Sequence, residues 1–414
     1  MLTLGEKNEL IEEIGLLAMR YLEDNVENMS SPTFEEDIEN NLLSILELQV
    51  QNLYTDDNKN FIIAELNELI YYTLNTIIYK HYIPKRSLFN RKSNFKTPKL
   101  IAKLENKIKT LESIPQAEQR TEEWYKERHQ RITASNAYKC LGSESMKNHI
   151  IYEKCKPVEV PDSAKEDEAP YVNTNTPCHH GQRYEPVSVL YYEYMYNTTV
   201  GEFGCIPHRD YCFIGASPDG INIDKKSDLY GRMLEIKNIK NRDITGIPKL
   251  EYWVQMQLQM ETCELNECDF LETRFVEYES ETEFNSDGDF QKTADGKFKG
   301  IIKHFINGNK PHYEYSPFNA NEEEYKQWEE DVMKKNSDKT WLEDIYWKLS
   351  EISCVLVLRN RKWFKNIIGK MENVWNTILF ERENGYEHRA PRKRQKTSPI
   401  GEKKVIEECS IIIE

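Results

Sequence analysis

Residues 214–238 read IGASPDGINIDKKSDLYGRMLEIKN, in which the turn-forming tetrapeptide SPDG precedes the apolar run MLEIKN. Strand side chains alternate between two faces, so Glu235 and Lys237 are expected on one face. If SPDG ends a neighbouring strand beside that face, Asp219 converges with Glu235. Two carboxylates at one point repel each other unless a cation lies between them. The stretch predicts either a surface ion pair or half of a metal site on a sheet.

The ligand chemistry of this stretch favours a hard cation. Oxygen ligands select Mg²⁺ or Mn²⁺ over zinc, and such an ion polarises a phosphodiester and lowers the pKa of its bound water. Lys237 would hold or deprotonate that water. The Glu-x-Lys spacing alone is weak, because it recurs at Glu105/Lys107, Glu324/Lys326 and Glu402/Lys404. Of these pairs, Glu235/Lys237 alone follows a proline–aspartate turn in a strand-like run.

Composition places the 414-residue chain among globular proteins, with 39% hydrophobic residues and a net charge of -15. This charge argues against a basic coat but leaves room for a local basic groove. We find no signal peptide and no run of about eighteen apolar residues, so we expect a soluble, intracellular protein without a membrane span. The nine cysteines form no CxxC pair, which disfavours a disulfide scaffold or zinc cage. Cys178-His179-His180 is a weak zinc candidate.

The fold class that we expect is α/β, with a central mixed β-sheet flanked by helices. Residues 1–115 carry apolar positions three and four apart, which predicts an all-helical N-terminal region. Residues 116–312 mix strand-like and helical runs and form the expected core. Residues 313–388 are predicted to be a helical C-terminal extension, and residues 389–414 a basic and acidic disordered tail.

Within the expected core, four runs are typical of strands: VGEFGCIPH, YCFIGASPDG, MLEIKN and ECDFLETRFVEY. The run PKLEYWVQMQLQMETCEL, between the last two, has the length and spacing of a helix. Strand, strand, helix, strand indicates a sheet with at least one helical crossover. The polar stretches 143–177 and 277–299 are expected to be loops or a protruding hairpin.

Two segments are locally basic. From Lys80 through Leu104 there is no acidic residue, and Phe89 and Phe95 interrupt a series of lysines and arginines. Such a segment either tracks phosphates or links two domains. The cluster RAPRKRQK at 389–396 is a nuclear-import signal, a DNA-binding arm or a solvated tail.

Other residues bear on nucleic-acid chemistry. Glu185 precedes Pro186 in an expected first helical turn, where proline is tolerated and acids are favoured. Trp124 and Arg128, four residues apart, share one helical face. The Thr-Ala-Ser that follows, 133–135, suits the N-terminus of a second helix, which is a natural phosphate site.

Glutamines on the crossover helix are also informative. Gln255 and Gln259 share one face, whereas Gln257 points away. A buried amide needs hydrogen-bond partners, so Gln255 is expected to find them at the sheet.

These features together resemble the lambda-type exonucleases, also called YqaJ-type viral recombinase nucleases, of the PD-(D/E)xK superfamily. The resemblance covers roughly residues 120–275. It depends on five ordered blocks: W-x3-R-x3-I-T-A-S from Trp124, G-x2-Y-E from Gly181, S-P-D-G from Ser217, L-E-x-K from Leu234 and Y-x2-Q-x-Q-x2-M from Tyr252. The helical flanks lie outside these blocks and look like those of members from large DNA viruses.

The resemblance assigns metal ligands. Asp219, Glu235 and the backbone carbonyl of Ile236 would bind a divalent ion, Mg²⁺ with Mn²⁺ as a substitute. Glu185 would bind a second ion or a metal-bound water. Lys237 would position the attacking water.

The resemblance also assigns the contacts to DNA. Gln255 would orient Lys237 and the scissile strand. A 5′-terminal phosphate would be held by Arg128, Ser135 and Ser217, with Trp124 and Thr133 beside them. The alternative is that Arg128 pairs with a nearby carboxylate.

The function that these residues imply is metal-dependent hydrolysis of one strand of linear duplex DNA from its 5′ end, in recombination, repair or replication. One alternative is an endonuclease, or a nuclease for DNA and RNA, with the same site. Another is a non-catalytic DNA-binding or scaffold protein, with acidic residues 277–289 recruiting partners. The resemblance further implies a homo-oligomeric ring on double-stranded DNA ends, and a single-strand annealing or replication protein as partner. The basic cluster leaves a nuclear or viral DNA-replication site possible.

Overall fold

The computed structural model of the chain describes residues 2–50, 58–79, 96–117, 121–158, 173–174, 176–308 and 310–390. Most of the predicted basic segment, residues 80–95, lies outside the described residues. The same holds for the C-terminal tail beyond Ala390, so the predictions for the cluster at 389–396 stay predictions.

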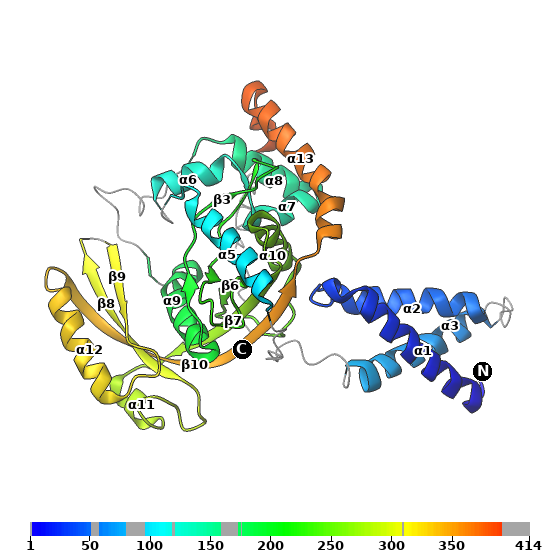
Figure 1. Ribbon diagram of the computed structural model, residues 1–414, viewed down its shortest axis with the longest axis horizontal. Helices are drawn as coiled ribbons and strands as arrows, with labels where there is room; N and C mark the ends of the chain where they lie inside the picture. Colours follow the sequence, from blue (N-terminus) through cyan, green and yellow to red (C-terminus); the bar gives the residue numbers. More distant parts are fainter. Residues whose placement is uncertain are drawn as a thin grey trace, which may run out of the picture.

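The N-terminal region is a helical bundle with its own core, as the sequence predicts (Figure 1). Its apolar side chains recur every three or four residues, and Ile14, Phe34 and Leu66 are fully buried. Thr3 caps the first helix in a reciprocal bond with Glu6. The elements are α1 (Leu4–Asp24), η1 (Val26–Asn28), α2 (Phe34–Val50), α3 (Lys59–Thr73) and the π-helical turn η3 (Leu74–Ile78).

The chain then enters the core through helix α5 (Pro98–Ser113), which Thr97 caps. Just before it, the Lys96 ammonium donates to the carbonyls of Asp228 and Tyr230, each at 2.7 Å. The described end of the predicted basic segment is therefore attached to the core, as a linker would be.

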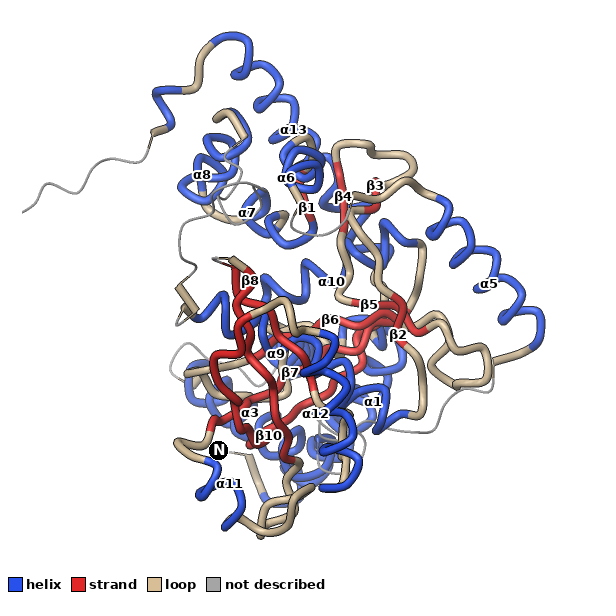
Figure 2. Tube along the Cα trace, turned by 90° about the vertical axis from the view of Figure 1, so that its left-hand side faces the viewer, coloured by secondary structure: helices blue, strands red, loops and turns tan. Residues whose placement is uncertain are grey.

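The core is a mixed sheet with strand order β2–β5–β6–β7–β10–β8–β9 (Figure 2). Strands β6 and β7 are parallel, and α10 crosses between them, which confirms the predicted crossover. Its elements are β2 (Val200–Gly201), β5 (Gly220–Asn222), β6 (Met233–Asn238), α10 (Leu250–Cys263), β7 (Glu267–Glu277), β8 (Lys299–Asn307), β9 (Lys310–Tyr315) and β10 (Thr340–Leu358).

Three strands that precede β5 along the chain form a smaller sheet, ordered β1–β4–β3. It comprises β1 (Ile132–Thr133), β3 (Ile206–Pro207) and β4 (Ile214–Ala216). Because β4 ends at Ala216 and β5 begins at Gly220, the SPDG turn connects the two sheets.

Helices cover both faces of the large sheet. On one face, α10 and α13 (Arg361–Asn384) pack with Met233 and Phe270 in one hydrophobic cluster. On the other, α9 (Pro177–Tyr196) packs against Leu234 and Ile236. The predicted alternation along β6 is therefore confirmed, since Leu234 and Ile236 share the α9 face. The predicted α/β class with flanking helices is confirmed as well.

The C-terminal region corrects one expectation. The two predicted helices are present as α12 (Glu322–Lys335) and α13. Between them, however, β10 is a 19-residue strand that pairs with both β7 and β8. The sheet therefore runs across the boundary expected at residue 312, and the extension is not purely helical. Ile345, Trp347 and Leu349 are buried at alternate positions, which is typical of a strand. The helical patterns on both sides of this segment favoured a helical interpretation of the whole region.

An arm extends from the core at the N-terminal end of β10, where β10 pairs with β8 (Figure 1). Strands β8 and β9, α11 (Glu281–Ser286) and α12 form it, around a small cluster that includes Tyr278, Phe284 and Tyr325. The expected hairpin at 277–299 thus contains a short helix, α11.

Helix positions differ from the sequence expectation in two places. Thr176 caps α9 with Pro177 in its first turn, so the helix begins well before Pro186, which lies in its interior. The expected first-turn position of Glu185 is therefore wrong. Within the expected loop 143–177, Ser143 caps helix α8 (Glu144–Cys155).

A buried polar network fixes β6 in this arrangement. Arg232, just before β6, donates to Asp269 on β7 at 3.2 Å and to Glu267 at 3.1 Å. Tyr192 on α9 donates to the same Asp269 at 2.6 Å, and Asn222 on β5 donates to Tyr192. Burial raises the pKa of Asp269, although Arg232 opposes this shift. The network joins α9, β5, β6 and β7 in the described structure.

We predict that Asp269→Ala lowers the free energy of unfolding by about 3–5 kcal/mol, because it leaves the buried Arg232 with only the partly exposed Glu267 and removes the acceptor of buried Tyr192. Urea unfolding followed by circular dichroism measures this loss. Glu322→Ala, which removes the exposed pair with Lys326, is the control and should cost less than about 1 kcal/mol. Equal losses in both variants would contradict the prediction.

Candidate active site

The SPDG turn is hydrogen-bonded to strand β6. Asp219 Oδ2 accepts from the Ile236 backbone N–H at 2.7 Å. This contact holds Asp219 beside Glu235, which is fully buried on the sheet. The structure therefore brings Asp219 and Glu235 together, as the sequence predicts.

Both carboxylate oxygens of Glu235 have partners. The Lys237 ammonium contacts Oε1, and Gln259 Nε2 donates to Oε2 at 2.6 Å. Lys237 also lies over the ring of Tyr252, with the ammonium 5.2 Å from the ring centroid. We call Asp219, Glu235, Lys237 and Gln259 the carboxylate site.

The electrostatics of the carboxylate site favour a positive charge. Burial raises the pKa of Asp219, and the charges of Glu235 and Glu185 raise it further, against Lys237 and the Ile236 N–H. Burial also works against the charge on Lys237, but Glu235 and Asp219 outweigh it and raise the pKa of that ammonium. Lys237 is therefore protonated at neutral pH, and the acidic groups gain from a cation.

Gln259, rather than Gln255, makes the contact at the sheet. Gln255 lies one turn earlier on α10 and is half-buried, and its side chain makes no hydrogen bond to the described residues. Gln257 points elsewhere, as predicted, and donates to the Leu358 carbonyl at 2.8 Å. The two candidates share a face, so periodicity alone could not select between them.

Glu185 acts on the carboxylate site through its charge. It comes from α9 and raises the pKa of Asp219 by its charge. Among the described residues, no group of three or more His, Cys, Asp or Glu side chains is positioned to hold a metal ion. Glu185 therefore does not complete a three-carboxylate cluster, and the weak zinc candidate Cys178-His179-His180 finds no support.

A second group surrounds Arg128, on the short helix α6 (Glu122–His129), which Thr121 caps. The guanidinium lies 4.2 Å from the centroid of the Trp124 ring and donates to Ser217 Oγ at 3.3 Å and to Ser135 Oγ at 3.2 Å. Thr133 Oγ1 lies 3.3 Å from Ser135 Oγ. These five residues, the Arg128 cluster, are the ones expected together from the sequence.

The local structure around Ser135 differs from the expectation. Ser135 lies in the 3-10 turn η4 (Ala134–Asn136), and Thr133 makes no capping bond to it. The helix that follows, α7 (Tyr138–Leu141), is only four residues long. An anion at this place would therefore meet the hydroxyls of Ser135 and Ser217 and the guanidinium of Arg128, rather than a helix N-terminus. Within the described part of the chain, both hydrogen bonds of the guanidinium go to hydroxyls, whereas the alternative was a carboxylate.

The Arg128 cluster and the carboxylate site adjoin each other. Ser217 and Asp219 belong to the same turn, and Gln259 Nε2 lies 3.4 Å from the Ser217 carbonyl. One amide group thus contacts both Glu235 and the turn that carries Ser217.

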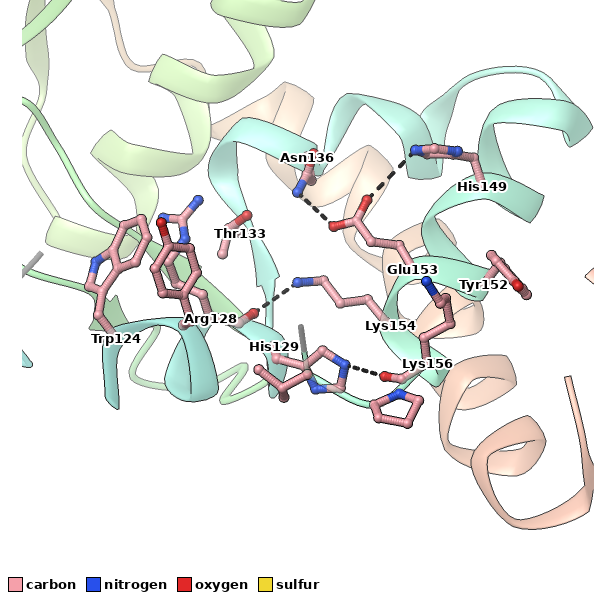
Figure 3. A pocket seen from close by; sticks show the side chains of 13 residues that line it. Trp124, Arg128, His129, Thr133, Asn136, His149, Tyr152, Glu153, Lys154 and Lys156 are labelled. Carbon is pink, nitrogen blue, oxygen red and sulfur yellow. Dashed lines mark hydrogen bonds and ion pairs between the residues drawn. The ribbon is translucent and has the colours of Figure 1, made fainter. Parts of the chain in front are cut away.

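Helix α13 contacts the segments that carry the Arg128 cluster. Its Arg382 donates to the carbonyls of Lys154 at 3.0 Å and His129 at 3.1 Å. The Lys154 ammonium in turn donates to the Arg128 carbonyl at 2.9 Å (Figure 3). Burial lowers the pKa of Lys154 to about 8. The C-terminal helix, whose role the sequence leaves open, therefore supports the end of α6.

An aspartate on a turn beside a Glu-x-Lys strand of a mixed sheet, with a crossover helix behind it, defines a PD-(D/E)xK nuclease core. Residues 123–266 match the YqaJ-like viral recombinase domain. Over these residues the chain is similar to the YqaJ-like viral recombinase family.

Individual proteins are similar to this chain to different extents. The uncharacterized protein R354 of Acanthamoeba polyphaga mimivirus is 30% identical over 316 residues, which cover 67% of this chain. They cover 55% of R354, so the chain spans about half the length of that curated relative. The expected likeness to a protein of a large DNA virus is confirmed.

Among solved structures, an alkaline exonuclease (LHK-Exo) from Laribacter hongkongensis is 20% identical, with a TM-score of 0.35. The match covers 65% of this chain and 95% of that one. The same enzyme in complex with dAMP matches equally.

No helix in the described part of the chain is both long and apolar enough to span a membrane.

We predict that Gln259→Ala lowers the free energy of unfolding by about 1–3 kcal/mol, because buried Glu235 loses a hydrogen-bond donor. Gln255→Ala, on the same helix face, is the matched control and should change stability by less than about 0.5 kcal/mol. Urea unfolding of both variants measures the difference. The reverse order would show that Gln255 makes the sheet contact.

Proposed function

We propose that this protein is a metal-dependent deoxyribonuclease that degrades one strand of linear duplex DNA from the 5′ end. The observation that carries the proposal is that Ser217 and Asp219 share one turn, so an anion site adjoins a pair of buried carboxylates and a lysine. Phosphate binding beside hydrolytic groups suits an enzyme that grips a strand end and cuts next to it.

The residues at the carboxylate site fit a hard divalent ion. Asp219 and Glu235 offer carboxylate oxygens with lone pairs beyond those already used. The N–H and C=O of one strand residue point to the same side, so the Ile236 carbonyl faces the side of Asp219. In addition, the buried Gln259 Oε1 has no hydrogen-bond partner among the described residues, which suits an aqua ligand. Glu185 would hold such a water rather than the ion itself.

When bound, Mg²⁺ or Mn²⁺ would polarise the phosphodiester and make its water more acidic. The chain's own groups do the rest. Lys237, protonated against Glu235 and Asp219, holds the attacking water and offsets negative charge on the phosphate. Gln259 fixes the Glu235 carboxylate, a different role from the one expected of Gln255, which was to orient Lys237 and the scissile strand.

The Arg128 cluster supplies direction. A guanidinium and two hydroxyls make charge-assisted hydrogen bonds to a terminal phosphate. Stacking on Trp124 keeps the guanidinium plane in one orientation. A strand whose 5′-phosphate is held there offers the next phosphodiester to the carboxylate site, which gives 5′ to 3′ degradation.

We predict that the protein with Mg²⁺ degrades 5′-phosphorylated linear duplex DNA to mononucleotides and spares closed circles. Glu235→Gln and Lys237→Ala should abolish cleavage while circular dichroism still shows a folded chain, because Gln keeps the size and shape of buried Glu235 and the Lys237 side chain is partly exposed. Gel analysis of linear and circular duplexes, with and without EDTA, provides the test. Intact linear strands after incubation with wild type would overturn the proposal, and cleaved circles would favour an endonuclease.

We predict that Arg128→Ala reduces the preference for a 5′-phosphate over a 5′-hydroxyl end about tenfold or more, because a hydrogen bond to a charged group contributes about 1.5–3 kcal/mol. Initial rates on the two ends measure the preference. Lys126→Ala is the control, since Lys126 lies on the same helix and pairs with exposed Glu122. A preference that survives in Arg128→Ala would remove Arg128 from end recognition.

The ring oligomer, the annealing or replication partner and the role in recombination remain part of the proposal by resemblance. A non-catalytic scaffold is the alternative from another class. Thermal unfolding with Mn²⁺ distinguishes the proposed nuclease from such a scaffold. An ion that binds the crowded carboxylates of the native state raises the melting temperature of the nuclease.

A further inference from the structure

A pocket of about 540 Å³ lies beside the Arg128 cluster, between helices α6 and α8 (Figure 3). Arg128 and Thr133 belong to its wall, and Thr133 contacts Ser135. None of Asp219, Glu235 and Lys237 lines it. The pocket therefore adjoins the Arg128 cluster and is separate from the carboxylate site.

The volume exceeds what a terminal phosphate needs. Arg128, Ser135 and Ser217 already supply the donors for one phosphate group. A pocket of several hundred Å³ accommodates a ligand of nucleotide size.

The walls of the pocket combine aromatic rings with cations. Tyr125 stands edge-on to Trp124, with ring centroids 4.9 Å apart. Across the pocket, the Lys156 ammonium lies 5.8 Å from the centroid of the Tyr152 ring. Lys154, buried behind Arg128, adds a second cation. Rings that stack bases next to cations that contact phosphates are the usual means of binding single-stranded nucleic acid.

Two polar groups in the wall suit a base or sugar. His129 Nε2 lies 2.8 Å from the Lys156 carbonyl, which only accepts, so Nε2 carries the proton and Nδ1 is an acceptor. Nδ1 is buried without a hydrogen-bond partner in the described part of the chain. Asn136 donates to Glu153 at 3.3 Å, which offers an amide and a carboxylate at one place.

We propose that this pocket is a subsite for one unpaired nucleotide joined to the 5′ side of the phosphate at Arg128. This inference rests on the proposed function. The carboxylate of Glu153, paired with Lys139 at 3.2 Å, offers acceptor oxygens to the amino groups of a neutral base. The protein would then accept a 5′ end that carries a single-nucleotide flap.

The chemistry stays that of the proposed hydrolysis. Water adds to the phosphorus that follows the first paired nucleotide, and the bond from phosphorus to the 3′-oxygen breaks. The 3′-oxygen leaves with a proton, as the hydroxyl of a released dinucleotide. The remaining strand retains a 5′-phosphate, which then occupies the Arg128 cluster in the next cycle.

The test uses the full chain with Mg²⁺ and two duplexes with a labelled 5′-phosphate, one flush and one with a single-nucleotide 5′ flap. Wild type should release labelled mononucleotide from the flush end and labelled dinucleotide from the flap. Tyr152→Ala/Lys156→Ala should slow the flapped end about fivefold or more relative to the flush end, because it removes a stacking ring and a cation.

Controls separate the possible results. Lys147→Ala, on the same helix α8 and paired with Glu144, should leave both rates unchanged. Labelled mononucleotide from the flap, no cleavage of the flap, or equal slowing of both ends in the double variant would overturn the inference alone. Failure on the flush end would overturn the proposed function, and the inference with it.

Discussion

The hydrogen bond from the Ile236 N–H to Asp219 is the constraint on which the site depends. It fixes the SPDG turn, which joins the small sheet to the large one. The small sheet in turn pairs β4 with β1, where Thr133 lies just ahead of Ser135. One backbone contact thus helps to set the distance between the hydroxyls of the Arg128 cluster and the carboxylates. Arg232 and its buried partners hold β6 from the opposite end, so the strand cannot shift in register without breaking that network.

Gln259 links strand β6 to the SPDG turn. Its amide nitrogen contacts the Glu235 carboxylate and the Ser217 carbonyl. The position of the Arg128 cluster also depends on α13, where Arg382 donates to carbonyls at the ends of α6 and α8. The C-terminal helix is therefore part of the proposed end-recognition machinery, although it lies outside the residues that match the family.

The sequence predicts local chemistry well and long-range pairing poorly. The faces of β6, the crossover helix and the members of the Arg128 cluster follow from periodicity and ordered blocks. The choice between Gln255 and Gln259 does not, because a helical face fixes direction but not depth along the axis. Strand β10 was missed because its pairing partners lie far away in the chain. The start of α9 was misplaced because Pro186 looks like a first-turn residue, while Thr176 and Pro177 provide the actual N-terminus.

The length of β10 has a practical consequence for fragment design. A 19-residue strand at about 3.3 Å per residue extends roughly 60 Å, and its two halves complete different hydrogen-bond ladders. Any truncation that ends before Thr340 would expose the edges of β7 and β8 at once and invite aggregation. An expression fragment of the matched domain alone, ending at residue 266, would also lack β7. Soluble shorter versions should therefore remove the N-terminal bundle, which has a separate core, rather than the C-terminal side.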